Sequence, residues 1–264
     1  YLRTDEQCRR TIPDRSADRH RDCQECVARE LRNGDLTHHQ RSSAEDGWLP
    51  QIRSRHRVRG LAEVYTDERE VSAMLDLVLD MFPSIENPGN TDRLFLEPAC
   101  GHGNFLVEIL RRKLAAVSPN RYGRSERFEH RVLRCLTSSY GIDISLDNIA
   151  EARKRMRAVV AAHLQHHLVV EPTTGFASAV ETILGTNLIC ADTLNEAAEI
   201  ELIEYQPGAA GTFMREWSHP LDSASDELTL FRTSVRRDKF PVHYSQLAQQ
   251  PEPVFDARLG QDAA

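Results

Sequence analysis

The stretch LFLEPACGHGNFL, residues 94–106, decides the fold of this 264-residue chain. Its apolar start, residues 94–96, is typical of a short buried strand, and the strand ends at the acid Glu97. Gly101 and Gly103 follow in a tight segment, after which apolar residues recur at helical spacing. The order of strand, glycine turn and helix predicts the first unit of an α/β sheet.

Further strands and helices are predicted on both sides of this unit. Residues 140–144 and 187–191 predict a second and a third strand, and Ser145 is a typical N-cap for a long helix after the second one. Strands that alternate with helices favour a parallel sheet with right-handed crossovers. Upstream, apolar spacing predicts a helix over residues 71–82, ending before Pro83.

An acid stands at the carboxyl end of each predicted parallel strand, namely Glu97, Asp143 and Asp192. Ligands of open α/β sheets bind beyond the carboxyl ends of the strands, so these acids are candidate ligand contacts. A carboxylate after the second strand can accept hydrogen bonds from ribose hydroxyls, and one after the third can accept the adenine amino group. Taken singly, each acid is also a common solvated loop residue.

The glycine turn indicates which nucleotide is expected. A dinucleotide fingerprint requires G-x-G-x-x-G to receive a pyrophosphate, whereas here Asn104-Phe105-Leu106 opens the helix and Glu97 precedes the turn. An anionic side chain at this place favours a cation over a phosphate. S-adenosylmethionine, which carries a sulfonium and an ammonium group, therefore fits the acid-rich turn.

Residues 96–106, LEPACGHGNFL, resemble the first cofactor motif of adenine-N6 DNA methyltransferases of restriction-modification systems, which reads L-E-P-A-C-x-x-G-x-F-L. Residues 141–144 resemble the second motif and residues 189–194 the third. Residues 61–66, LAEVYT, are similar to the G-E-x-Y/F-T-P element that covers the methionine end of the cofactor, although Ala62 and Asp67 depart from that pattern. The motif order resembles the gamma type.

The resemblance implies a Rossmann-like, S-adenosylmethionine-dependent methyltransferase fold with DNA as a partner. It implies no metal ion. The residues it places around the cofactor are Thr66, Glu97, Ala99, Gly101, Gly103, Asn104, Phe105, Asp143, Ile144, Asp192 and Leu194.

The catalytic motif of the family is absent from the sequence. These enzymes carry N/D/S-P-P-Y/F, in which a polar side chain and a prolyl carbonyl hold the target amino group of a flipped base while the aromatic ring stacks on it. This chain has no Pro-Pro pair, and residues 205–207 (YQP) and 218–221 (SHPL) are the nearest candidates. Both lie at a predicted hairpin of residues 200–205 and 212–217. No catalytic residue is therefore assigned.

Nothing after Trp217 reads as a further parallel strand and crossover helix. The predicted sheet is therefore incomplete, with its first strand open, and an open apolar edge is one that proteins cover. We expect a second polypeptide, or a missing C-terminal part, to supply the catalytic motif and target recognition.

Three segments are expected: a polar N-terminal extension (1–57), a cofactor-binding domain (58–220) and a C-terminal tail (221–264) that is disordered or forms an interface. Cys23 and Cys26, near Cys8, His20, His38 and His39, offer ligands for zinc, but no second regular pair is present and ordinary thiols are the preferred interpretation. The net charge of −7 neither supports nor excludes DNA. The sequence shows neither a signal peptide nor a membrane span, so a cytoplasmic protein is expected.

Three functions remain open at this point. The chain could be a component of a DNA methyltransferase, a methyltransferase for another acceptor, or a non-catalytic cofactor-binding module of a defence complex.

Overall fold

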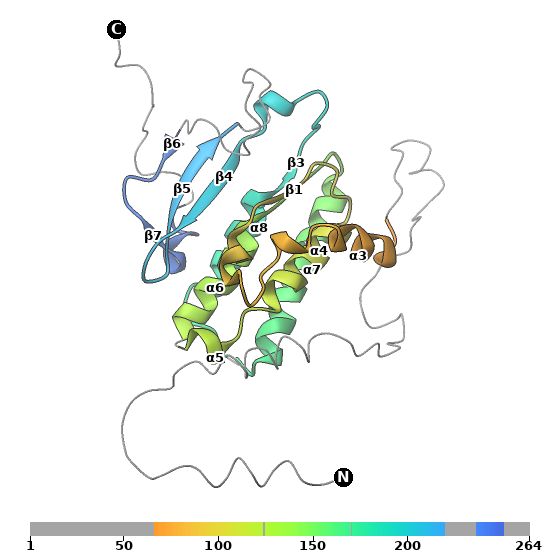
Figure 1. Cartoon of the computed structure of the whole chain (residues 1–264). Coiled ribbons are helices and arrows are strands. Elements are labelled where there is room, and N and C mark those ends of the chain that lie inside the picture. The colour runs from red at the N-terminus through yellow and green to blue at the C-terminus, as the bar shows by residue number, and fades with distance from the viewer. Residues whose placement is uncertain (1–65, 124, 170, 220–235, 251–264) are drawn as a thin grey trace, which may run out of the picture. The chain divides into compact units, whose positions relative to one another are not determined.

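A computed structural model of the chain describes residues 66–123, 125–169, 171–219 and 236–250. Its first sheet consists of β1 (Phe95–Glu97), β2 (Ser139–Asp143) and β3 (Leu188–Cys190), all parallel and in the order β1-β2-β3. The parallel α/β arrangement expected from the sequence is confirmed (Figure 1). The predicted N-terminal extension and the candidate zinc ligands lie outside the described residues.

Six helices are described around this sheet, together with four short 3-10 segments. The predicted N-cap of α7 is confirmed, since the Ser145 hydroxyl accepts a hydrogen bond from the backbone N–H of Asn148. Two of the helices, α6 and α8, are not predicted from the sequence, and each ends within two residues of the start of a strand. The helices are α3 (Glu68–Asp76), α4 (Asn104–Leu114), α5 (Pro119–Tyr122), α6 (Ser125–Thr137), α7 (Leu146–His166) and α8 (Phe176–Asn187).

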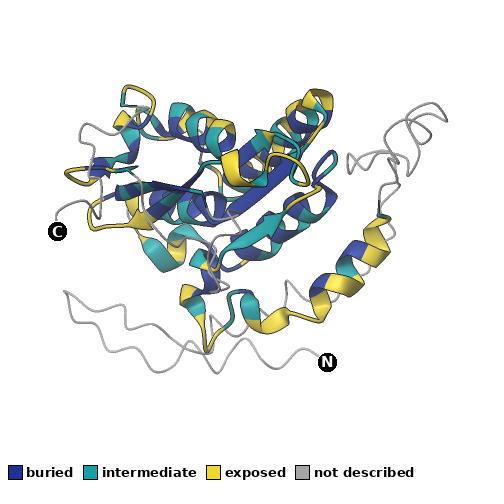
Figure 2. Cartoon of the chain, turned by 90° about the horizontal axis from the view of Figure 1, so that it is seen from above, coloured by how far each residue is buried: buried dark blue, intermediate teal, exposed yellow. Residues whose placement is uncertain are grey.

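The helix after the glycine turn packs closely on the sheet. A Cβ atom at Gly141, in β2, would lie 2.5 Å from Leu106 Cδ1 and 3.1 Å from the Cys100 side chain. Glycine at this position therefore allows α4 to approach β2. Leu106 and Cys100 belong to the main hydrophobic core, which also contains buried residues of α6, α7 and α8. Figure 2 shows the buried residues concentrated in the strands and on the inner faces of the helices.

The upstream helix is shorter than the predicted 71–82. It ends at Asp76, and the chain then continues through a 3-10 turn, η1 (Leu79–Met81), to Phe82. The turn brings the Phe82 ring onto Phe95 of β1, with ring centroids 5.1 Å apart. Helical spacing alone does not distinguish a helix that continues to Phe82 from a helix that ends at Asp76 and is followed by a 3-10 turn, because both place Phe82 on the apolar side.

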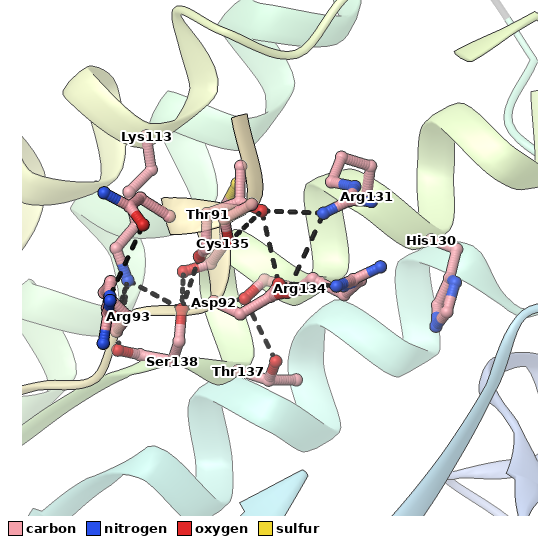
Figure 3. Close-up of polar contacts among 12 residues, drawn as sticks. Thr91, Asp92, Arg93, Lys113, His130, Arg131, Arg134, Cys135, Thr137 and Ser138 are labelled. Carbon is pink, nitrogen blue, oxygen red and sulfur yellow. Dashed lines mark hydrogen bonds and ion pairs between the residues drawn. The ribbon is translucent and has the colours of Figure 1, made fainter. Parts of the chain in front are cut away.

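The start of β1 is fixed by a buried polar network (Figure 3). The Lys113 side chain is fully buried, and its Nζ donates to the Arg93 carbonyl at 2.7 Å and to Ser138 Oγ at 2.6 Å. Burial lowers the pKa of Lys113 to about 7. Ser138 Oγ in turn donates to the Thr91 carbonyl at 2.9 Å. These bonds join the segment before β1 to the start of β2, and so position the glycine turn at the other end of the strand.

The face of the sheet opposite to α4 is covered less completely. Tyr140 and Ile142 of β2 are buried against Ile200 and Leu202, whereas the flanking apolar residues are only partly buried. Within the described part of the chain β1 hydrogen-bonds to β2 alone, so it forms one edge of the sheet. The partly buried residues on this face are Leu94, Leu96, Ile189 and Ala191.

The predicted hairpin is confirmed as β4 (Leu202–Pro207) and β5 (Thr212–Ser218), which pair antiparallel. Two short strands extend it, β6 (Arg236–Arg237) and β7 (Val242–His243), followed by η4 (Tyr244–Gln246). Residues 236–250, which the sequence assigns to a tail, are therefore folded onto the hairpin. Val242, Tyr244 and Leu247 enter the main core, and this burial is the physical reason for the difference.

Candidate functional site

The loops after the three parallel strands meet at one edge of the sheet. Glu97 is the last residue of β1 and Asp143 the last residue of β2, while Asp192 follows β3 by two residues. The Ala191 N–H donates to the Asp143 carbonyl at 3.1 Å, which continues the β2–β3 pairing toward Asp192. Thr193 Oγ1 donates to the Pro98 carbonyl at 3.1 Å and so joins the first and third loops. The structure thus brings the three predicted acids to a common edge.

The turn between β1 and α4 requires glycine at two positions. Gly101 has a φ of 52° and Gly103 a φ of 85°, both in the left-handed region that glycine adopts without strain. A Cβ atom at Gly103 would also lie 3.0 Å from Ala152 Cβ, so α7 packs directly on the turn. The chain here offers backbone rather than side chains, and a ligand can approach it closely.

Asp143 joins the end of β2 to the glycine turn after β1. Its Oδ2 accepts the Gly101 N–H at 2.9 Å, and its Oδ1 accepts the Ser145 N–H at 2.8 Å and Asn148 Nδ2 at 3.1 Å. A carboxylate has about four acceptor positions, so one remains on Oδ2 for a further donor. A ligand with two adjacent hydroxyls would bind with both only by displacing the Gly101 bond.

Glu97 lies at the start of the turn and is partly buried. Burial raises the pKa of its carboxyl above the usual 4.5, and a hydrogen bond from the Ala99 N–H opposes this shift. That bond, to Oε1, is long at 3.3 Å. A partly desolvated carboxylate attracts a neighbouring cation more strongly than a carboxylate in bulk water does.

If a cation binds beside Glu97, its affinity should depend on pH. The carboxylate is neutralised as the pH falls through its raised pKa, so affinity should be full at neutral pH and should begin to fall above the usual 4.5. We expect titrations of S-adenosylmethionine from about pH 8 to about pH 5 to show this decline in wild type and a flatter profile in Glu97→Gln. Identical profiles for the two proteins would remove Glu97 from the site.

Asp192 holds its own loop together. Its Oδ1 accepts the Leu194 N–H at 2.9 Å and the Asn195 N–H at 3.1 Å, and its Oδ2 accepts Asn195 Nδ2 at 2.7 Å. These bonds, that of the Asn195 side chain first, lower the pKa of Asp192. The acid is therefore ionised at neutral pH, and Oδ2 retains capacity for one more donor.

Thr66 and Asn104 are joined on the other side of the turn. Asn104 Nδ2 donates to the Thr66 carbonyl at 2.8 Å, and Asn104 Oδ1 accepts Arg155 Nη1 at 2.8 Å. The segment of residues 61–65, part of the upstream element, lies outside the described residues.

Apolar residues flank the acids at this edge. Ile144 is 59% exposed and Leu194 is 91% exposed, and Ala99 is exposed as well. Exposed apolar side chains beside hydrogen-bonding acids suit a flat heterocycle such as adenine. Phe105 is placed differently, because it packs against the cluster of Val71, Leu75, Phe82 and Ile109 near α3.

Three residues join this edge that the sequence did not identify. Asn148 and Arg155 come from α7, and Thr193 from the loop after β3. A polar residue three positions after an N-cap is a weak signal for Asn148. Thr193 lies within residues 189–194, the segment that resembles the third motif, whereas no signal marks Arg155. The described residues contain no group of three metal-ligating side chains, and none of their helices is both long and apolar enough for a transmembrane span.

A cleft of about 220 Å³ lies at the amino end of the sheet, away from the acids. Its lining includes the Arg134–Asp92 ion pair and Glu204, whose pKa burial raises. Since its charged groups include both signs and its arginine is already paired, it offers no set of convergent groups comparable to the acid edge. The lining residues are Asp92, Leu94, Arg134, Thr137, Ser138, Glu204, Tyr205, Gln206 and Pro207.

Comparison with known proteins returned no matching family model, no matching curated protein and no matching solved structure.

Proposed function

We propose that this chain binds S-adenosylmethionine and serves as the cofactor-binding component of a DNA adenine-N6 methyltransferase of a restriction-modification or defence system. The observation that carries the proposal is the hydrogen bond of 2.9 Å between the Gly101 N–H and Asp143 Oδ2. It joins the glycine turn after β1 to the acid after β2, the two features on which the sequence resemblance rests.

The residues at this edge fit the chemistry of the cofactor. Asp143 has an acceptor position for the ribose, and Asp192 has one for the adenine amino group. Ile144 and Leu194 provide apolar surface for the base. Glu97 provides negative charge near the sulfonium and ammonium groups, and Thr66 and Asn104 lie beside the turn at the methionine end. The strand order β1-β2-β3 is compatible with one half of a Rossmann-like methyltransferase sheet.

The cofactor supplies an already activated methyl group, so the protein needs little acid–base chemistry. What the chain's own residues can do is orient the cofactor, through Asp143 and Asp192, and limit water at the turn. Nothing in this arrangement holds a target base.

The group that holds the target base is expected from elsewhere. Tyr205, the aromatic residue of one candidate segment, is only 5% exposed, and its hydroxyl lies 2.8 Å from Thr186 Oγ1. A ring buried in this way offers no face for a base to stack on. Ser218 is also buried at the end of β5, and residues 220 and 221 of the second candidate lie outside the described residues.

Features of the sheet favour a partner that covers it. β1 forms an edge within the described residues, and four apolar residues on the less covered face are only partly buried. We propose that a second polypeptide, or a further part of a longer protein, pairs with β1 and carries the catalytic motif and the target-recognition part. DNA then contacts the complex rather than this chain alone.

The test is a methyl-transfer assay with labelled S-adenosylmethionine. The chain is assayed alone and together with the product of its genomic neighbour, with adenine-containing DNA, protein or small molecules as acceptors. Transfer to DNA only with the neighbour present supports the proposal. Transfer to a non-nucleic acceptor alone would select a different methyltransferase, and binding without transfer in any combination would select a non-catalytic module.

A further inference from the structure

Arg155, on α7, makes hydrogen bonds to the glycine turn. Its Nη1 lies 2.9 Å from the His102 carbonyl, 2.6 Å from His102 Nδ1 and 2.8 Å from Asn104 Oδ1. His102 is fully buried and Asn104 is 6% exposed, so this contact is made inside the protein. A charged donor in such a setting makes stronger hydrogen bonds than a neutral one.

The same helix face shapes the turn by steric contact. Ala152 lies one helical turn before Arg155, and it occupies the space that a Cβ atom at Gly103 would need. Gly103 stands between His102 and Asn104, so the three turn residues are all fixed by α7. Asn104 extends the connection, since its Nδ2 donates to the Thr66 carbonyl at 2.8 Å.

The hydrogen bonds of Arg155 described above lie at one end of the candidate site. They reach residues 102 and 104 and, through Asn104, residue 66. The hydrogen bonds that the Asp143 and Asp192 carboxylates accept come from other residues, at the end proposed for the adenosine.

We propose that Arg155 is a positioning residue for the methionine end of the cofactor, acting through the His102 carbonyl and the Asn104 side chain. This inference rests on the proposed function. In this proposal different residues act on the two ends of the cofactor. Arg155 of α7 positions the turn that binds the amino-acid part, and the acids at the strand ends bind the nucleoside. Loss of Arg155 should therefore weaken the binding of a ligand that carries the amino-acid part and leave unchanged the binding of a ligand that lacks it.

The experiment compares two ligands by isothermal titration of the full chain. S-adenosylmethionine has the amino-acid part, and 5′-methylthioadenosine lacks it but keeps the adenosine. In Arg155→Met we expect S-adenosylmethionine to bind about tenfold more weakly, which corresponds to about 1.4 kcal/mol. The affinity for 5′-methylthioadenosine should stay within about twofold of wild type. Arg155→Lys should recover part of the loss, because one ammonium replaces the charge but not the planar donor geometry.

Arg153 provides the matched control on the same helix. Its Nη2 donates to the Gly185 and Leu188 carbonyls, away from the turn, at 3.0 Å and 2.5 Å. Arg153→Met should lower the melting temperature without changing the ratio of the two affinities. If Arg155→Met weakens the binding of both ligands equally, or of neither, Arg155 has only a structural role. The inference then fails, while the proposed function stands. If wild type binds neither ligand, the proposed function fails first.

Discussion

Replacing Asp143 by asparagine should weaken S-adenosylmethionine binding by about 100-fold, equivalent to about 2.8 kcal/mol. The substitution keeps the volume of the side chain but removes its charge and turns one acceptor into a donor. The new NH₂ group would face either the Gly101 N–H or the Ser145 N–H, both of which the carboxylate now accepts. A ribose hydroxyl would therefore lose a charged acceptor, and a hydrogen bond to a charged group contributes about 1.5–3 kcal/mol.

Asp147→Asn is the matched control for this experiment. Asp147 is exposed in the first turn of α7, four residues after Asp143, and the same chemical change there should leave the affinity within about twofold. Both variants are titrated calorimetrically at a temperature where circular dichroism shows them folded. Equal affinity in wild type and Asp143→Asn would remove this acid from the cofactor site.

Replacing Asp238 by alanine should cost about 3–5 kcal/mol of the free energy of unfolding, because it leaves the Arg215 charge buried without its partner. Both side chains of this ion pair are 1% exposed. Arg215 Nε donates to Asp238 Oδ2 at 2.8 Å, and Nη2 donates to Oδ1 at 3.0 Å. For a domain of this size we expect the melting temperature to fall by roughly 10 °C.

Lys239→Ala is the control for Asp238→Ala, since Lys239 is the exposed next residue and its loss should change stability by about 0.5 kcal/mol or less. Urea unfolding followed by circular dichroism measures both variants. A loss for Asp238→Ala as small as that for Lys239→Ala would mean that residues 236–250 are not part of the folded domain. That outcome would restore the interpretation of this segment as a tail.

The part of the fold that could be predicted is the part with strong local signals. Residues 94–106 combine a short apolar run with glycines that the structure places at positive φ, so strand, turn and helix follow from local chemistry. The three acids were found because parallel strands bring their carboxyl ends to one edge. Ser145 was found because N-caps depend on one side chain and the next turn of helix.

The parts that were missed depend on contacts between distant residues. The helix predicted over 71–82 ends at Asp76, and the turn that follows places Phe82 on Phe95, which is distant in sequence. Residues 236–250 resemble a polar tail, but three apolar residues of this segment enter the main core. Asp238 also pairs with Arg215, which lies 23 residues before it. In α6, charged residues interrupt the apolar positions Phe128, Val132 and Leu136, whose spacing is nevertheless helical.

The candidate site shows the same division. The acids and glycines follow from the ends of the strands and from the turn. Arg155 and Thr193, although Thr193 lies within the third motif segment, act through backbone carbonyls of other loops. A sequence does not indicate which side chain binds a backbone carbonyl, because every residue has a backbone carbonyl.

We propose that a positively charged nucleoside binds where the loops after β1, β2 and β3 meet. A crystal of the chain soaked with S-adenosylmethionine tests it most directly. We expect density for the ribose beside Asp143, for the adenine near Asp192, and for the methionine part over residues 101–104. An empty edge at saturating cofactor, or cofactor density anywhere else on the chain, would contradict it.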